Sequence, residues 1–160
     1  MDVKGKIFVN TRAIIERNRD GAAEIIVQWR DKRGEGCWEL PGGCIEPYEP
    51  LYAALKREIL EETGLEITGI VGSNCYFQEG DVEFLQPYSV YQTLEGYVDS
   101  IGFHFVCQAH GEPLKSGDDT KHVKWVNLDE LQQLINNENF SNIDKGAAML
   151  YLKQKTEAGA

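Results

Sequence analysis

The chain of 160 residues is long enough for a sizeable hydrophobic core, and we expect one domain over residues 1–160. Hydrophobic residues make up 42% of the sequence, which excludes a largely disordered protein. The formal net charge of −10 argues against binding of polymeric nucleic acid, because DNA- and RNA-binding surfaces are basic. The sequence has neither a secretory signal nor a long apolar run, so we expect a cytoplasmic protein that does not cross a membrane.

The N-terminal part of the chain predicts a β-hairpin. Residues 11–17 and 23–30 are rich in the apolar and β-branched side chains that are typical of strands. Between them, residues 18–21 (Asn-Arg-Asp-Gly) form a turn signal. We therefore expect two antiparallel strands joined by this turn.

A helix is predicted from about Pro50 to Thr63. Pro50 suits the first helical turn, where its missing N–H would lack an intrahelical partner anyway, and Gly64 suits a left-handed helix end. One apolar stripe recurs at spacings of three and four residues, formed by Leu51, Ala54, Leu55 and Ile59. The preceding residues 41–43 (Pro-Gly-Gly) predict a loop without regular structure, because glycine frees the backbone for unusual angles.

The rest of the chain predicts further strands, followed by helices. Extended segments are expected at residues 66–77, 82–92, 99–108 and 122–126, and helices at residues 128–135 and about 142–155. Strands with one central helix and C-terminal helices favour a mixed β-sheet between helical layers. The predicted fold class is therefore α/β, or α+β by some schemes.

The predicted central helix carries Glu58, Glu61 and Glu62 at spacings of three and four residues, where like charges destabilise a helix by roughly 0.2–0.5 kcal/mol per pair. A run of charges is most often a solvated helix face, and that interpretation stays open. The alternative is a divalent-cation site, because hard oxygen ligands suit Mg²⁺ or Mn²⁺. Two observations favour the metal site: only Lys56 and Arg57 offset the charge along this helix, and a Gly-Gly loop precedes it.

These residues form a pattern that resembles the Nudix box, G-x5-E-x7-R-E-U-x-E-E-x-G-U, in which U is an apolar residue. The positions are filled without departure by Gly43, Glu49, Arg57, Glu58, Ile59, Glu61, Glu62, Gly64 and Leu65. Seven fixed positions would match a random window with a probability on the order of 10⁻⁹. The resemblance implies the α/β/α sandwich of the Nudix hydrolase superfamily, with the box as a loop–helix–loop.

The resemblance also implies roles for the matched residues. The expected ligands of Mg²⁺ or Mn²⁺ are Gly42 (through its carbonyl oxygen), Glu58, Glu61 and Glu62. Arg57 would orient the glutamates by pairing with Glu49, and a plain surface ion pair is the alternative interpretation. Gly43 and Gly64, together with Glu49, would support the motif.

A general base is also expected, and Nudix enzymes place it variably. In MutT-type members an acidic residue lies shortly before a Trp-containing strand. Counting back from Trp125 gives Asp119, with Asp118 as the second choice. Residues 116–120 (Ser-Gly-Asp-Asp-Thr) are also an ordinary turn sequence, and one of the box glutamates is the other candidate for the base.

For the reaction, the resemblance implies hydrolysis of a nucleoside diphosphate linked to another group, X. The downstream markers of the other Nudix subfamilies are mostly absent, so the first hypothesis is a MutT-type pyrophosphohydrolase that cleaves a (d)NTP to NMP and pyrophosphate. An ADP-ribose or nucleotide-sugar pyrophosphatase is the second hypothesis, and a non-catalytic nucleotide-sensing module is the third. The oligomeric state stays open, with a homodimer as one alternative.

Overall fold

The computed structural model describes residues 4–32, 35–72, 76–117, 120–137 and 139–159. The strands are β1 (Ile7–Arg19), β2 (Ala22–Lys32), β3 (Glu35–Glu39), β4 (Gly42–Cys44), β5 (Glu66–Ile70), β6 (Tyr76–Glu79), β7 (Val82–Leu85), β8 (Ser89–Gln92), β9 (Asp99–His110), β10 (Ser116–Gly117) and β11 (Thr120–Asn127). The helices are α1 (Leu51–Thr63), α2 (Leu128–Asn136) and α3 (Asn142–Ala158). Within the described ranges, none of these helices has the length and apolar character needed to cross a membrane.

The main sheet of the described chain has the strand order β10-β11-β2-β1-β9-β5. Three further strands pair alongside this path: β3 with β2, β4 with β1, and β8 with β9. Strands β1 and β9 run parallel over nine residue pairs, from Ile7↔Asp99 to Ile15↔Cys107, whereas the other pairs are antiparallel. The sheet is therefore mixed, as the sequence predicts.

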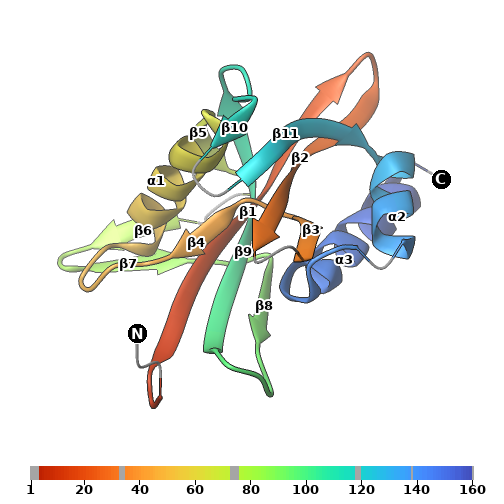
Figure 1. Ribbon diagram of the computed structural model, residues 1–160. Helices are drawn as coiled ribbons and strands as arrows, with labels where there is room; N and C mark the ends of the chain where they lie inside the picture. Colours follow the sequence, from red (N-terminus) through yellow and green to blue (C-terminus); the bar gives the residue numbers. More distant parts are fainter. Residues whose placement is uncertain (1–3, 33–34, 73–75, 118–119, 138, 160) are drawn as a thin grey trace.

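The sheet lies between two helical layers, with α1 on one side and α2 and α3 on the other (Figure 1). Successive side chains of a strand point to opposite faces, and β1 follows this rule. Ile14 packs in the cluster that contains the buried residues of α2 and α3, while Ala13 and Ile15 pack in the cluster that contains Leu55 and Ile59 of α1. The α/β/α arrangement is confirmed, and β1 at its centre contributes to both cores.

The predicted hairpin and the predicted central helix are confirmed. Strands β1 and β2 are joined at Asp20 and Gly21, whose φ angles of 52° and 86° are those that a tight hairpin turn requires. Helix α1 ends at Gly64 in the left-handed conformation, with φ 75°. Pro50 is not the first helical residue but the extended residue directly before the helix, with ψ 139°.

Two of the predicted extended segments are each divided into two separate strands. Residues 66–77 and 82–92 were each expected to be one extended segment, yet each contributes to two different sheets. Strands β5 and β8 pair with β9 in the main sheet, while β6 and β7 form a separate two-stranded hairpin. Pro87 lies between β7 and β8, and because proline lacks a ladder donor the chain can leave one sheet there and join another.

The expectation of an irregular loop at residues 41–43 is wrong for two of its three residues, since Gly42 and Gly43 belong to the short strand β4. This strand pairs with β1 through Thr11↔Gly43 and Arg12↔Gly42. A Cβ atom on Gly42 would lie 2.3 Å from the carbonyl oxygen of Thr11, and the φ angle of Gly42 is 149°. Glycine is therefore what permits the pairing: it allows the backbone to lie directly against β1.

Candidate active site

Residues 40–43, which lead into β4 and are called the glycine loop below, lie beside helix α1 and its box carboxylates. Gly43 lies so close to the carboxylate of Glu58 that an added Cβ would be 2.5 Å from it. From one turn further along α1, Glu62 accepts a hydrogen bond of 2.9 Å from the backbone N–H of Gly42. The motif glycines thus lie in contact with the carboxylates because they carry no side chain.

Glu62 is the buried carboxylate of the three, with 5% of its surface exposed. Besides Gly42, Gln28 donates to it at 2.8 Å and Arg30 forms an ion pair with it at 2.8 Å. Burial raises the pKa of Glu62 to about 7, although the hydrogen bonds from Gly42 and Gln28 and the charge of Arg30 act in the opposite direction. Glu62 is thus held in one orientation by three donors from two strands, β2 and β4.

Glu58 and Glu61 are arranged around Arg57 on the more open side of α1. Arg57 donates to Glu58 at 2.7 Å and lies 3.4 Å from Glu61. Its Nε and Nη2 form a bidentate pair with Glu49 at 2.8 and 2.9 Å, and Nη2 also donates to the carbonyl oxygen of Cys44. The pairing of Arg57 with Glu49 that the sequence predicts is present in the structure.

Electrostatics agree with this geometry. The hydrogen bond from Arg57 is the main reason that the pKa of Glu49 is lowered to about 2, assisted by the backbone N–H of Glu46. The same bond to Glu49, together with Glu58, raises the pKa of Arg57. Arg57 is therefore a permanent cation that joins the two ends of the motif.

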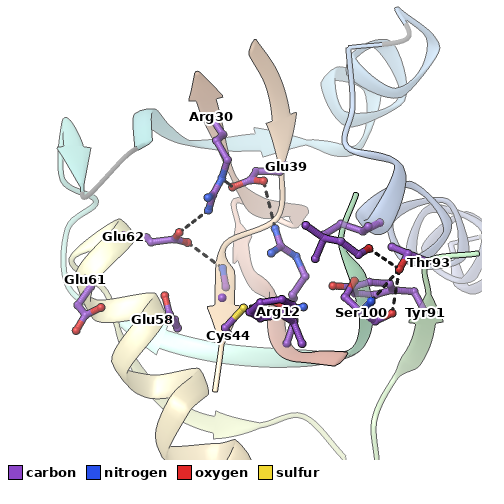
Figure 2. A pocket seen from close by; sticks show the side chains of 16 residues that line it. Arg12, Arg30, Glu39, Cys44, Glu58, Glu61, Glu62, Tyr91, Thr93 and Ser100 are labelled. Atoms are coloured by element: carbon purple, nitrogen blue, oxygen red, sulfur yellow. Dashed lines mark hydrogen bonds and ion pairs between the residues drawn. The ribbon is translucent and has the colours of Figure 1, made fainter. Parts of the chain in front are cut away.

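The carboxylates open into a pocket of about 580 Å³ between β1, β4, α1, β8 and β9 (Figure 2). One end is charged and is lined by Arg30, Glu39, Glu58, Glu61 and Glu62, with Arg12 between the two ends. The other end is neutral and contains Tyr91, Thr93 and Ser100. The remaining uncharged side chains of the lining are Phe8, Asn10, Cys44, Val98 and Ile143. The pocket thus offers one environment suited to charged groups and another suited to an uncharged, partly apolar group.

The carboxylates of the pocket form a donor set for a divalent cation. Glu58, Glu61 and Glu62 line the same pocket, and their hard oxygen atoms suit Mg²⁺ or Mn²⁺. No three acidic, histidine or cysteine side chains among the described residues converge as a ready-made metal cage. Mg²⁺ is normally held by one or two carboxylates plus water and substrate phosphate, so the residues present fit such a loosely coordinated ion.

Asp119, the predicted general base, and Asp118 lie outside the described residues. The strand that contains Trp125, from which Asp119 was located, is β11, and it lies next to β2 in the sheet. The box glutamates Glu58, Glu61 and Glu62, among which the alternative base was expected, all line the pocket.

Four further polar residues of the site were not found by sequence analysis: Arg12, Gln28, Arg30 and Glu39. Gln28 and Glu39 are direct partners across the β2–β3 ladder, and Gln28 donates to Glu39 at 3.0 Å. Arg30, two residues along on the same face of β2, pairs with Glu39 at 2.6 Å. The available signal was the pair of polar side chains Gln28 and Arg30, at alternate positions directly after the apolar residues 25–27 of β2.

The fold and the site define an α/β/α protein with a glycine-bounded acidic pocket. The chain belongs to the Nudix family, because the sequence profile of the NUDIX domain matches residues 8–145. Hydrolases of this family generally use divalent cations.

Two relatives illustrate the range of the family. An ADP-ribose pyrophosphatase of Methanocaldococcus jannaschii is 30% identical over 112 residues, which cover 69% of this chain. An 8-oxo-dGTP diphosphatase of Buchnera aphidicola is 38% identical over 58 residues, or 36% of this chain. The chain spans only 57% and 42% of the lengths of these two relatives, respectively.

Solved structures support the fold. A MutT Nudix hydrolase from Burkholderia pseudomallei is 23% identical, with a TM-score of 0.62 over 93% of this chain and 98% of that one. The Nudix domain of Shewanella oneidensis NrtR, solved with ADP ribose, is 15% identical, with a TM-score of 0.67 over 97% and 90% of the two chains. At these identities the likeness concerns the fold alone.

Proposed function

We propose that this protein is a metal-dependent hydrolase of a nucleoside diphosphate linked to another group, X. The observation that carries the proposal is the pocket itself, into which the three box carboxylates and the Gly42–Gly43 backbone open together. A diphosphate with its cation fits the charged end, and an uncharged nucleoside or sugar fits the neutral end.

The charged end suits a diphosphate only when a cation is present. The carboxylates of Glu58, Glu61 and Glu62 would repel phosphate oxygens, and the arginines Arg12 and Arg30 are already paired with carboxylates of the chain. A bound Mg²⁺ or Mn²⁺ would neutralise the diphosphate oxygens and lower the pKa of the attacking water. Gly42, Glu58, Glu61 and Glu62 are the residues that would hold it.

The chain's own residues have three tasks in this scheme. Arg57 keeps Glu58 and Glu61 on the pocket side of α1 through the contacts described above. Gln28 and Arg30 fix the orientation of Glu62. A proton acceptor is still required for the attacking water, and the candidates are Asp119 and one of the box glutamates.

The first substrate class we propose is a (d)NTP, which would be cleaved to NMP and pyrophosphate as in MutT-type enzymes. The second class is ADP-ribose or a nucleotide sugar. It is favoured by the relative from M. jannaschii, which is named an ADP-ribose pyrophosphatase and matches more than two thirds of this chain. A cytoplasmic location and a single domain belong to the same proposal.

Product analysis separates the two classes. The purified protein is incubated with Mg²⁺ or Mn²⁺ and with a panel of (d)NTPs, ADP-ribose and nucleotide sugars, and the products are resolved by anion-exchange chromatography. NMP with pyrophosphate supports the first class, and AMP with a sugar phosphate supports the second. Absence of turnover with every compound and both cations would refute the proposal.

The variant Glu62→Gln tests the assignment of the site. We expect kcat to fall by about three orders of magnitude, on the order of 4 kcal/mol of transition-state stabilisation, because a central metal ligand is lost. Glu66→Gln is the matched control: Glu66 lies on the surface of β5, where its side chain is 63% exposed, and kcat should not change. Wild-type turnover in Glu62→Gln would remove Glu62 from the reaction.

A further inference from the structure

A carboxylate of the C-terminal helix lies against the glycine loop from the side opposite to α1. Asp144, in the first turn of α3, is fully buried. Its Oδ2 accepts a hydrogen bond of 3.1 Å from the backbone N–H of Leu40, two residues before Gly42. The Nudix box therefore does not contain all the groups that hold its own loop.

Arg12 of β1 completes this contact. Its Nε and Nη2 donate to the two oxygens of Asp144 at 2.6 and 2.9 Å, and Nη2 also donates to the carbonyl oxygen of Leu40. Side chains thus bind both backbone polar groups of Leu40: Asp144 accepts from its N–H, and Arg12 donates to its carbonyl oxygen. We call Arg12, Asp144 and Leu40 the loop clamp.

The remaining contacts of the loop clamp are also buried. His104 of β9, 1% exposed, approaches Oδ1 of Asp144 with its Nε2 at 2.8 Å and Ser89 Oγ with its Nδ1 at 3.1 Å. The carboxylate of Asp144 is therefore engaged by four donor atoms. Because Asp144 is buried and all four hydrogen bonds are directional, its carboxylate fixes the positions of the groups that donate to it.

The loop clamp is continuous with the metal-binding part of the site. After Leu40, the carbonyl oxygen of Pro41 accepts from the N–H of Ala13 at 2.9 Å, and the N–H of Gly42 donates to Glu62. Three successive residues of the loop are therefore fixed from three directions. This sequence of bonds determines where the Gly42 carbonyl oxygen points.

We propose that Asp144 is a positioning residue for catalysis: through Leu40 it sets the orientation of the Gly42 backbone toward the cation and the diphosphate. This inference rests on the proposed function, since it assigns Asp144 to that same reaction. Asp144 does not line the pocket and acts through the loop.

The test is Asp144→Asn, which keeps the side-chain size and removes the charge and one acceptor oxygen. We expect kcat to fall by about 10–100-fold, because small displacements of reacting groups cost factors of this size. The Mg²⁺ concentration for half-maximal activity should rise, while KM for the nucleotide at saturating Mg²⁺ should change less than threefold. Amide exchange at Leu40 and Gly42, followed by NMR, should accelerate.

Tyr151→Phe is the matched control on the same helix. Tyr151 is buried and donates to Glu16 of β1 at 2.6 Å, so the variant loses a bond between α3 and β1 that does not reach the loop. It should keep wild-type kcat, Mg²⁺ dependence and exchange at Leu40. Where Asp144→Asn does not fold, His104→Phe removes one of the four bonds to Asp144 and should shift the same three readouts in the same direction, by about 2–10-fold.

The outcomes separate this inference from the proposed function. Folded Asp144→Asn with wild-type kcat, Mg²⁺ dependence and exchange would overturn the inference, as would equal losses in Asp144→Asn and Tyr151→Phe. Absence of hydrolysis by the wild-type protein would refute the proposed function and the catalytic role of Asp144 with it. If the wild-type protein shows no hydrolysis, faster amide exchange at Leu40 in Asp144→Asn would still support the loop clamp as a structural contact.

Discussion

Two arginines organise carboxylates on opposite sides of the glycine loop, and their surroundings differ. Arg57 on α1 contacts Glu49, Glu58 and Glu61 with 29% of its side chain exposed. Arg12 on β1 contacts Asp144 and Glu39 with 4% of its side chain exposed. Water can replace the partners of the first arginine, whereas the partners of the second have at most 5% of their side chains exposed.

This difference separates two kinds of control over the same loop. Partly exposed ion pairs contribute about 0–1 kcal/mol to stability, so the contacts of Arg57 can rearrange on binding of the proposed cation and substrate. Breaking a buried pair costs about 3–5 kcal/mol, because a charge is left without a partner or water. Arg12 should therefore determine the shape of the site, and Arg57 should adjust the groups that act in it.

The largest effect is expected from Arg12→Ala. This variant leaves Asp144 buried without its cation, whereas Glu39 keeps its ion pair with Arg30. The free energy of unfolding should fall by about 3–5 kcal/mol. Arg17→Ala on the same strand is the control, because the Arg17 side chain is 34% exposed and pairs with Glu24 near the surface. It should cost about 1 kcal/mol or less. Urea denaturation followed by circular dichroism measures both, and equal losses would contradict the comparison.

Gly43→Ala should affect activity more than stability. The added methyl group would displace the flexible Glu58 side chain, whose carboxylate lies 2.5 Å from the Cβ position. We expect kcat to fall by about 10–100-fold with a change in unfolding free energy of about 1 kcal/mol or less. Gly146→Ala on α3 meets no atom within 4 Å and is the control with unchanged kcat. A fully active Gly43→Ala would show that the position of Glu58 is unimportant.

Arg57→Ala tests the partly exposed arginine in the comparison between Arg57 and Arg12. We expect a loss of about 1 kcal/mol or less in stability, together with a fall of about 10-fold or more in kcat as Glu58 and Glu61 lose their common partner. Arg57→Lys keeps the charge but not the bidentate geometry toward Glu49, so its kcat should lie between those of the alanine variant and the wild type. Destabilisation comparable with that of Arg12→Ala would contradict the proposed division of roles.

The smallest effect is expected in the pH dependence of stability. Burial alone would raise the pKa of Asp144, but the charge of Arg12 and the hydrogen bond to His104 outweigh it, so the pKa lies below its usual value. A lowered pKa stabilises the folded state above the unfolded value of about 3.9. This stabilisation is lost as the pH falls through the folded value. Urea midpoints between about pH 5 and 2.5 should therefore fall more steeply for the wild type than for Asp144→Asn, and parallel curves would contradict this.

The parts of the molecule that sequence analysis predicted depend on neighbours within a few residues. Arg57 and Glu49 are eight positions apart, and Gly64 ends its helix through its own backbone angle. Local spacing was also sufficient for the β1–β2 hairpin. The roles predicted for the box residues stay predictions, as does that of Asp119.

The missed parts depend on contacts between distant residues. Arg12 and Asp144 are 132 positions apart, and no local pattern distinguishes them from surface charges. The β6–β7 hairpin was missed because its residues have strand composition, and composition does not reveal which sheet a strand joins. Likewise, Gly42 and Gly43 suggested a loop, whereas the flat surface of β1 beside them makes a strand possible.

The loop clamp has a consequence for transplanting the motif into another scaffold. A graft of residues 38–65 would carry every carboxylate of the box, yet it would leave Arg12 and Asp144 behind. The backbone N–H and carbonyl oxygen of Leu40 would then lack these two partners unless the host protein supplied others. In related chains, substitution of Arg12 should be accompanied by substitution of Asp144, and the reverse. Each of the two buried charges is compensated by the other.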